Sequence, residues 1–342
     1  MQKSKEKLIL AVDGGGSKTT IVGIELTHAQ TQWPTAVADC KFRCTLDAPS
    51  AAGESVWQVG HRNVVRAVEH ICQSANANIS QIRLLYLALS GAGRATDQAR
   101  VVDSIRAHPS MSAISEVVAA GDIDPIIHFQ PDPESHQSTI AVIVGTGSIV
   151  ATSTRDGHVV RAGGWGPILG DEASGWSLAR RALQQLCATL DSDIDMESAD
   201  PMSRACCKFI SSRFAESVSR EDRMILSSEI IRLANDRHAA ARMAPSILDL
   251  AYAENDPETH AFVSDQLTRL VRQIRLVMLR SRLDETPWIL VLSGGLISNH
   301  LGLQQHLLDL CHVCNVTPLG VVVASPTVAA LQMAVRHFRR VN

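Results

Sequence analysis

The sequence predicts an α/β protein made of two similar halves, with a long helical segment inserted into the second half. Two segments share one order of features, an apolar strand, a glycine-rich turn and a second strand, and they start near residues 8 and 139. A stretch of helical periodicity with almost no glycine follows from about 174 to 282. Recurrence of one supersecondary unit indicates an internal duplication, and the mixture of apolar strands with helices favours an α/β class.

The first half is predicted to be mainly strands joined by short connections. Short apolar or alternating runs bounded by glycine, proline or aspartate predict strands at 8–12, 20–26, 36–43, 84–89 and 116–120. The run 84–89 is apolar throughout, which is typical of a strand buried on both faces. Apolar residues at helical spacing predict one helix at 54–74.

The second half repeats the strand pattern and then becomes helical. Strands are expected at 139–144, 149–153, 158–161, 288–292 and 320–324. Helices are expected over most of 174–282, from about 299, and from Pro326 toward His337.

Composition excludes several classes of protein. With 342 residues, 45% hydrophobic and 20% charged, the chain is long enough for two globular domains. The net charge of −3 and the absence of a basic run argue against a nucleic-acid partner. Only five apolar residues precede Asp13, too few for a signal peptide, and no segment is long enough to cross a bilayer. We therefore expect a cytoplasmic protein with no membrane partner. Cys311 and Cys314 have metal-like spacing, but no second cysteine pair accompanies them, so reduced thiols are expected.

The first glycine turn is a candidate phosphate site, and it reads Asp13-Gly14-Gly15-Gly16-Ser17-Lys18-Thr19. Converging backbone N–H groups hold phosphate oxygens best where no Cβ atom obstructs them. Ser17 and Thr19 add hydroxyl groups, and Asp13 could orient a Mg²⁺ ion through water. The spacing matches neither the P-loop nor the dinucleotide-binding fingerprint. Taken alone, a plain hairpin turn explains these residues equally well.

Two further glycine turns favour phosphate binding over a plain hairpin. The second half carries Gly145-Thr146-Gly147-Ser148 after its first strand, and Ser293-Gly294-Gly295 after a later one. One such turn is weak support for a nucleotide site, whereas three of them together favour one.

The segment 163–175 is the densest signal in the chain. It holds five glycines, Trp165 and the adjacent acids Asp171 and Glu172, just before a helix expected to begin near Ser174. One of the acids could cap that helix. Capping leaves the glycines and the tryptophan unexplained, and these suit a loop that closes on a small polar ligand. The two interpretations are compatible.

The motifs together resemble those of a known family. In chain order, ILAVDGGGSKTTIVGI, LALSGAG, VIVGTGSIV, GGWGPILGDEASGWSLARRAL and ILVLSGGLISN resemble the N-acetylglucosamine kinase branch of the BadF/BadG/BcrA/BcrD ATPase family, within the actin, Hsp70 and sugar kinase superfamily. The resemblance implies duplicated ribonuclease-H-like domains of the actin-like ATPase fold, with an ATP cleft between them. The implied domains are 1–120 and 121–342, with a helical insertion at about 185–282 and a last helix at about 326–338 that packs back on the first domain.

The resemblance also implies an activity and its residues. The expected reaction is ATP-dependent phosphorylation of a small amino sugar, N-acetylglucosamine to its 6-phosphate, with Mg²⁺ held by Asp13 through water and Asp122 as general base. Nucleotide contacts would come from Asp13, Gly14, Gly15, Gly16, Ser17, Thr19, Gly145, Thr146, Gly147, Ser148, Gly294 and Gly295. Sugar contacts would come from Ser90, Gly91, Asp122, Thr146, Gly147, Gly163, Gly164 and Asp171. A homodimer is expected by analogy.

The chain departs from the family pattern at three places. The base motif reads Gly121-Asp122-Ile123-Asp124-Pro125, so Asp124 competes with Asp122 for the role of base. An asparagine expected near 45–50 is missing, with Asp47 as the nearest polar substitute, and the usual Pro-x-x-Gly-Ala near the C-terminus reads PTVAA from Pro326. These departures keep two alternatives open: an ATPase that drives a partner protein, and a sugar-binding regulator without turnover.

Overall fold

The computed structural model describes residues 6–15, 18–53, 56–135, 137–192, 196–211 and 220–341. The chain divides into two compact units, unit 1 with Met1–Thr139 and Val322–Asn342, and unit 2 with Ile140–Val321. The expected boundary at residue 120 therefore differs from the division in the structure. Residues 121–139 group with unit 1 because they directly follow a strand of its sheet, and the last helix groups with unit 1 as well.

Unit 1 is built on a five-stranded sheet with the order β3-β2-β1-β4-β5. β1 pairs antiparallel with β2 and parallel with β4, and β4 pairs parallel with β5. The strands are β1 (Leu8–Gly14), β2 (Thr19–Glu25), β3 (Phe42–Leu46), β4 (Ile82–Leu89) and β5 (Val117–Gly121).

The strand expected at 36–43 is wrong in its first part. Val37–Asp39 forms a 3₁₀ helix, and β3 begins only at Phe42. The Asp39 carboxylate accepts hydrogen bonds from the backbone N–H groups of Thr35 (2.7 Å) and Ala36 (2.8 Å). Local side-chain hydrogen bonds of this kind compete with strand pairing, and here they close a turn.

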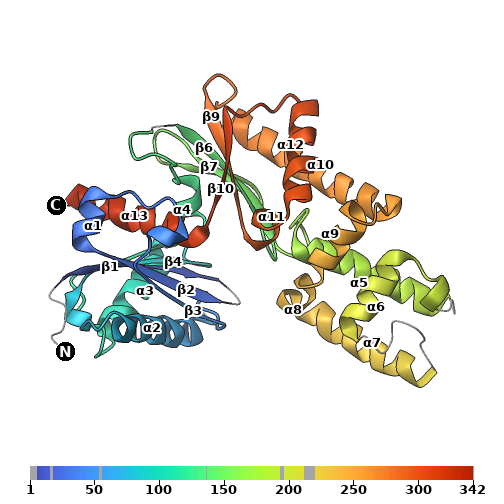
Figure 1. The fold of residues 1–342 in the computed structure, drawn as a ribbon, viewed down its shortest axis with the longest axis horizontal. Coiled ribbons are helices and arrows are strands. Elements are labelled where there is room, and N and C mark those ends of the chain that lie inside the picture. Colours follow the sequence, from blue (N-terminus) through green and yellow to red (C-terminus); the bar gives the residue numbers. More distant parts are fainter. Residues whose placement is uncertain are drawn as a thin grey trace. The chain divides into compact units, whose positions relative to one another are not determined.

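Helices cover both faces of the unit 1 sheet. The alternation along β1 sends Leu8, Leu10 and Val12 into a core shared with α2 and α3, and Ile9 and Ala11 into a core shared with α13. Figure 1 shows α13 on one side of the sheet and α2 with α3 on the other. The helices are α1 (Leu26–Thr31), α2 (Trp57–Ser74), α3 (Ala95–Ala107), α4 (Asp124–Ile127) and α13 (Pro326–Val341).

Gln332 ties α13 to the rest of unit 1. Its side chain is only 1% exposed. The amide nitrogen donates to the carbonyl oxygens of Pro34 (2.8 Å) and Gln130 (2.9 Å), and the amide oxygen accepts from the Gln130 N–H (3.1 Å). All three hydrogen bonds join the Gln332 side chain to backbone groups. They fix the C-terminal helix against loops that lie about 200 to 300 residues earlier in the chain.

Unit 2 repeats the sheet topology of unit 1. Its sheet has the order β10-β9-β6-β7-β8. Read from the opposite edge, the order of unit 2 is β8-β7-β6-β9-β10. When the strands of each unit are counted along the chain, both sheets therefore run third, second, first, fourth, fifth. The predicted fold class, duplicated α/β units, is thus present in the strand order itself. The strands are β6 (Ser138–Val144), β7 (Ser148–Ser153), β8 (Val159–Gly163), β9 (Trp288–Ser293) and β10 (Gly320–Ala324).

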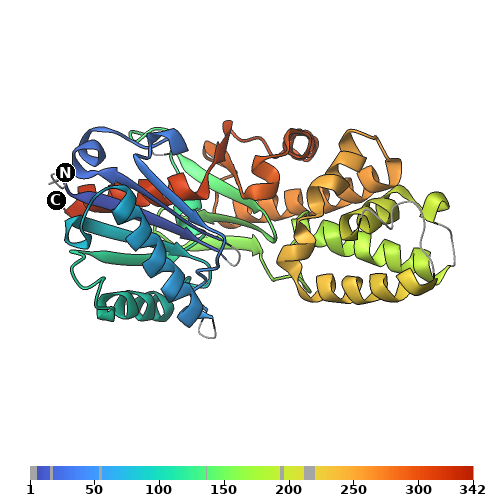
Figure 2. The ribbon, with the colours of Figure 1, turned by 60° about the horizontal axis from the view of Figure 1, so that its bottom comes forward.

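The helices of unit 2 bury most of its apolar surface in one core. Figure 2 shows the helices between the third and fourth strands, coloured green-yellow to orange, gathered at one end of this unit. Among the described helices, none combines the length and apolar composition needed to span a membrane. The helices are α5 (Gly175–Asp191), α6 (Pro201–Ile210), α7 (Arg220–Asn235), α8 (Arg237–Ala241), α9 (Ala244–Tyr252), α10 (Pro257–Arg280), α11 (Gly295–Ser298) and α12 (Leu301–Val313).

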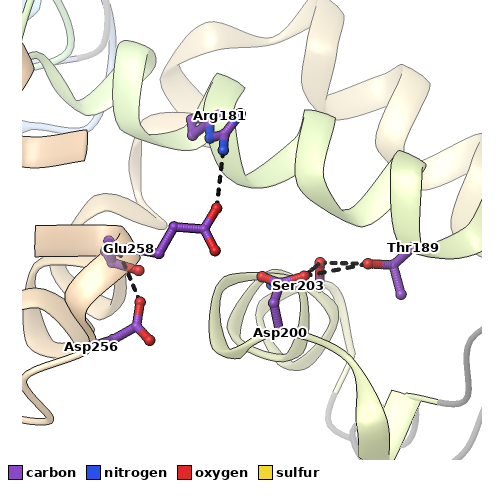
Figure 3. Close-up of polar contacts among 7 residues, drawn as sticks. Arg181, Thr189, Asp200, Ser203, Asp256 and Glu258 are labelled. Carbon is purple, nitrogen blue, oxygen red and sulfur yellow. Dashed lines mark hydrogen bonds and ion pairs between the residues drawn. The ribbon is translucent and has the colours of Figure 1, made fainter. Parts of the chain in front are cut away.

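Two of these helices begin with the same Asp-Pro signal, and Figure 3 shows both starts. The Asp200 carboxylate caps α6 by accepting the N–H of Ser203 (2.9 Å), and Asp256 caps α10 in the same way three residues ahead (2.8 Å). An aspartate N-cap followed by proline is a strong helix start. Arg181 on α5 reaches Glu258 in the first turn of α10 (3.3 Å), so the two longest helices of the segment are also joined by an ion pair.

Replacing Gln332 by methionine should destabilise unit 1. The change keeps the volume but leaves the Pro34 carbonyl oxygen and the Gln130 N–H without the Gln332 partner, which costs about 2–4 kcal/mol, while the Gln130 carbonyl oxygen keeps the Trp33 indole N–H. Urea unfolding of Gln332→Met compared with the unchanged protein measures this cost. The same change at Gln58, an exposed position of α2, should leave the unfolding free energy within about 0.5 kcal/mol. Equal stability of the two variants would contradict the bridging role of Gln332.

Candidate active site

The first glycine turn is a hairpin between β1 and β2. Asp13 and Gly14 pair with Thr20 and Thr19 in the antiparallel register. The Gly15 N–H donates to the carbonyl oxygen of Lys18 (3.1 Å). Two predicted nucleotide contacts, Gly16 and Ser17, lie outside the described residues.

The glycines of this turn differ in what surrounds them. A Cβ atom on Gly14 would lie 2.2 Å from the Ser50 hydroxyl oxygen and 2.4 Å from a methyl of Leu89, so Gly14 is required for packing. Among the described residues other than its chain neighbours, the atom nearest to a Cβ on Gly15 would be the Lys18 carbonyl oxygen at 3.9 Å. The Thr19 hydroxyl already donates to the Ala48 carbonyl oxygen (2.7 Å). Gly15 is therefore the described position of this turn where bare backbone faces open space.

Asp13 is a partly buried carboxylate at the end of β1. The hydroxyl of Thr327, at the start of α13, donates to its Oδ2 atom (3.3 Å). Burial and the negative charge of Asp122 raise the Asp13 pKa to about 6, against the opposing effects of Lys18 and the Thr327 hydrogen bond. Thr327 was not found by sequence reasoning. It lies in the C-terminal stretch that departs from the family pattern, and only the packing of α13 brings it to Asp13.

Ser90 and Asp122 come together although they were predicted from separate motifs. Leu89 and Gly121 are register partners in the parallel pair of β4 and β5, so Ser90 and Asp122 are each the first residue beyond their strand. The Ser90 hydroxyl donates a hydrogen bond to the Asp122 carboxylate. Burial raises the Asp122 pKa, and hydrogen bonds from its own backbone N–H, from the Ser90 hydroxyl and from the Ile123 N–H oppose the rise. Since Gly14 pairs with Leu89, Asp13 ends at the same edge of the sheet.

Asp124, the competing candidate for the base, is used to close its own turn. Its Oδ2 atom accepts the backbone N–H of Gly121 (3.0 Å), and its carbonyl oxygen accepts the His128 ring N–H (2.8 Å). It also opens the short helix α4. Asp122 also accepts hydrogen bonds, from its own backbone N–H and that of Ile123, but it lies one residue beyond β5 and beside Ser90, whereas Asp124 lies inside the turn that its side chain closes.

The wall of the unit 1 site near Gly91 has little free space. Gly91 has φ +85°, and a Cβ there would lie 3.0 Å from the Gly53 backbone nitrogen. The Ser90 carbonyl oxygen accepts the Ala52 N–H (2.7 Å), which holds the 50–53 segment against this turn. Asp47, which stands near the missing asparagine, is exposed in the loop after β3.

In unit 2 the second and third glycine turns lie side by side. A Cβ on Gly145 would be 3.7 Å from the Gly295 backbone nitrogen, while a Cβ on Gly295 would meet no other atom within 4 Å. Gly294 has φ +98°, and a Cβ there would lie 2.5 Å from the Val144 carbonyl oxygen. The carbonyl oxygens of Gly145 and Thr146 accept N–H groups from the first turn of α5 (2.8 and 3.0 Å). The pair of turns thus presents bare backbone at Gly295.

Asp171 lies against the second glycine turn. Its Oδ1 atom accepts the Ser148 N–H (3.2 Å), and a Cβ on Gly147 would come within 2.9 Å of the same oxygen. The side chain is 4% exposed, and within the described ranges its Oδ2 atom has no hydrogen-bond partner. Burial raises the Asp171 pKa, opposed by the Ser148 N–H. The structure therefore brings together three predicted sugar or phosphate contacts, Gly147, Ser148 and Asp171.

The helix cap expected from Asp171 or Glu172 is provided by another residue. Ser174 is the N-cap of α5, and its hydroxyl oxygen accepts the Ser177 N–H (3.1 Å). A serine at this position reaches the N–H three residues on, so neither acid is needed there. Gly163 and Gly164, predicted sugar contacts, have φ +72° and +65° and end β8 beside Gln273 and Ile149.

The chain is similar to two curated sugar kinases. Over 300 residues the chain is 24% identical to an N-acetylmuramic acid/N-acetylglucosamine kinase of Clostridium acetobutylicum, covering 86% of each protein. Over 194 residues it is 26% identical to an N-acetyl-D-glucosamine kinase of Dictyostelium discoideum, covering 55% of this chain and 56% of the relative.

Solved structures share the fold. A protein of Chromobacterium violaceum, provisionally named an N-acetylglucosamine kinase, superposes with a TM-score of 0.64 at 22% identity, covering 97% of this chain and all of its own. A ROK family glucokinase of Streptomyces griseus superposes with a TM-score of 0.57 at 14% identity, covering 97% and 99%. The predicted actin-like ATPase fold is confirmed. The profile of one family matches residues 10–256, which is most of the chain, and the protein belongs to the BadF/BadG/BcrA/BcrD ATPase family.

Proposed function

We propose that the protein is an amino-sugar kinase that transfers the γ-phosphoryl group of ATP to N-acetylglucosamine and forms the 6-phosphate. The observation that carries the proposal is the meeting of Asp13, Ser90 and Asp122 at one edge of the unit 1 sheet. The Clostridium and Dictyostelium relatives, both named as kinases of N-acetylated amino sugars, support the substrate class.

Asp122 is the proposed general base. A sugar hydroxyl is a poor nucleophile, and a carboxylate within hydrogen-bond reach accepts its proton as the phosphoryl group transfers. The raised pKa of Asp122 moves the group toward neutral pH, where a base accepts a proton more readily. The Ser90 hydroxyl orients the carboxylate by donating to it. Asp124 has its carboxylate engaged by Gly121 and is not the proposed base.

The described residues fit ATP and Mg²⁺. Gly295 offers exposed backbone with space around its Cα, as a phosphate cradle requires, whereas Gly15 leaves space near its Cα but donates its own N–H to Lys18. Among the described residues no three acids, histidines or cysteines group to hold a metal, and the proposed Mg²⁺ ligand is the carboxylate of Asp13, with Asp122 nearby. Mg²⁺ is suited to one carboxylate with waters and phosphate oxygens. When bound, Mg²⁺ neutralises charge on the phosphoryl oxygens.

Asp171 is the proposed acceptor for sugar hydroxyl groups in unit 2. Its Oδ1 atom is fixed by Ser148, and its Oδ2 atom is buried and available. Thr146, Gly147, Gly163 and Gly164 are proposed to line the same site. The homodimer expected by analogy stays a prediction, which sedimentation of the purified protein checks.

A coupled assay of ADP release tests the proposal directly. ATP and Mg²⁺ are supplied with N-acetylglucosamine, N-acetylmuramate, glucosamine or no sugar. Release that depends on an N-acetylated amino sugar supports the kinase. Release without sugar indicates an ATPase that drives a partner, and sugar binding without release indicates a regulator.

Asp122→Asn should lower kcat by at least about a thousandfold. The amide keeps the shape and the Ser90 contact but cannot accept the proton, so the dissociation constant for the sugar should change little. Asp124→Asn is the matched control and should keep most of the activity while lowering the melting temperature. An active Asp122→Asn beside an inactive Asp124→Asn would assign the base to Asp124.

Gly295→Val should raise the KM for ATP by about tenfold or more with no loss of stability. A Cβ at this position meets no described atom within 4 Å beyond its neighbours in the chain, so the added side chain mainly obstructs a ligand that passes over Gly295. Gly320→Val, at another glycine with open surroundings, is the control. Initial-rate kinetics with ATP varied give the answer, and an unchanged KM would remove this turn from the nucleotide site.

Activity should fall with acid as pH drops through about 6, the raised pKa of Asp13. Below that pH the carboxyl is protonated and cannot hold a cation, whereas above it the carboxylate is restored. Asp13 and Asp122 influence one another, so the measured value belongs to the pair. Thr327→Val removes a hydrogen bond that favours the carboxylate and should move the acid limb of kcat/KM to higher pH, while Thr327→Ser should not. A limb that Thr327→Val leaves in place contradicts the role of Asp13.

A further inference from the structure

Helix α10 reaches the glycine-rich 163–175 segment, although it begins at Pro257, just beyond the residues that the family profile matches. Gln266 and Gln273 lie seven residues apart, two turns of helix, and so share a face. The Gln266 amide oxygen accepts the Ala173 N–H (3.3 Å), and the Gln273 amide nitrogen donates to Glu172 Oε2 (2.8 Å). The helix is therefore hydrogen-bonded at two points to the turn that carries Asp171.

This turn has an unusual backbone that needs external support. Asp171 and Ala173 have φ +64° and +58°, the left-handed region that residues other than glycine rarely adopt. Such conformations persist where the surroundings hold them, and they cluster at ligand sites. The supporting contacts are those of Gln266 and Gln273, together with the Ser148 hydroxyl, which donates to the Glu172 carbonyl oxygen (2.6 Å).

The side-chain carbonyl oxygen of Gln273, Oε1, makes no hydrogen bond to the described part of the chain. Its amide nitrogen is committed to Glu172, which fixes the orientation of the amide. The Oε1 atom is buried and, in the part of the chain that the structure describes, has no hydrogen-bond partner. A Cβ on Gly163 would lie 2.4 Å from Oε1, so the glycine leaves room for this oxygen. Buried carbonyl oxygens in native proteins are almost always paired.

Gln273 Oε1 and Asp171 Oδ2 belong to one connected set of side chains. Gly163 pairs with Ile149 in the β7–β8 register, next to Ser148, which binds both Asp171 and Glu172. Two buried acceptors without partners thus stand on the same small network. A ligand that supplies hydroxyl or amide N–H donors would satisfy both.

We propose that Gln273 is a substrate-binding residue whose side-chain carbonyl oxygen accepts a hydrogen bond from a hydroxyl or amide N–H of the amino sugar. Its amide nitrogen at the same time anchors Glu172 and the Asp171 turn. The inference rests on the proposed function and extends it, since it adds an acceptor from α10 to the sugar site. Two unpartnered acceptors on one network select a ligand that offers two donors.

Two substitutions separate the acceptor from the anchor. Gln273→Met removes both, and Gln273→Lys keeps a donor for Glu172 but removes the acceptor. Both variants should raise the KM for N-acetylglucosamine about tenfold, the size of one hydrogen bond in a desolvated site. The KM for ATP should stay within about twofold, because the nucleotide does not contact this oxygen. Gln305→Met, the same change on the exposed face of α12, is the control and should leave both constants unchanged.

Calorimetric titration of the sugar and thermal unfolding accompany the kinetics. A Gln273→Lys variant with the original sugar affinity would show that Gln273 only anchors the turn and would overturn the proposal, as would a Gln273→Met variant with that affinity. If the unchanged protein binds and phosphorylates the sugar, and both Gln273 variants bind the sugar with the same affinity, only this inference is contradicted and the proposed function stands. If the unchanged protein neither binds nor phosphorylates any amino sugar, the proposed function fails and this inference fails with it.

Discussion

The candidate site of unit 1 depends on the parallel register of three strands. Gly14 of β1 pairs with Leu89 of β4, which pairs in turn with Gly121 of β5. Because side chains alternate along a strand, a slip of one residue would move a whole strand's side chains to the opposite face. The buried alternation of β1 between two cores forbids such a slip. Register therefore sets two carboxylates, Asp13 and Asp122, at one edge, and their proximity contributes to the raised pKa of Asp13.

The same topology carries different chemistry in unit 2. Where unit 1 ends its first strand with Asp13, unit 2 ends β6 at Val144 and continues into Gly145, and the end of β9 brings Gly294 against Val144. At the end of its first strand, one copy of the duplicated plan thus presents a carboxylate and the other presents glycine backbone. A kinase needs both, since proton transfer requires a titratable group and phosphate is held best by backbone N–H groups. Duplication followed by divergence at strand ends supplies both without changing the fold.

Local signals in the sequence were sufficient for most strands and all three glycine turns, because apolar runs and glycine clusters report on short-range structure. The shift of β3 was missed because one carboxylate, Asp39, closes a turn within an alternating run. Thr327 and Gln332 were missed for a different reason. Their partners Asp13 and Gln130 are 314 and 202 residues away, and nothing local to α13 indicates these contacts. Ser174 took the capping role expected of the acids, although a serine before a helical run is itself a recognisable signal.

Helix α10 illustrates how a site can be tuned without disturbing the core that supports it. Its apolar face, with Leu267, Leu270 and Ile274 fully buried, packs into the core of unit 2. Gln266 and Gln273 project from another face toward the turn at 171–173. The two faces bear different constraints, because burial fixes the size of the apolar side chains, whereas the polar face must only match the donors and acceptors beside it. Changes at the polar positions can therefore alter the hydrogen bonds made to the turn while the helix stays in place, so a helix beyond the residues that the family profile matches can still tune the proposed sugar site.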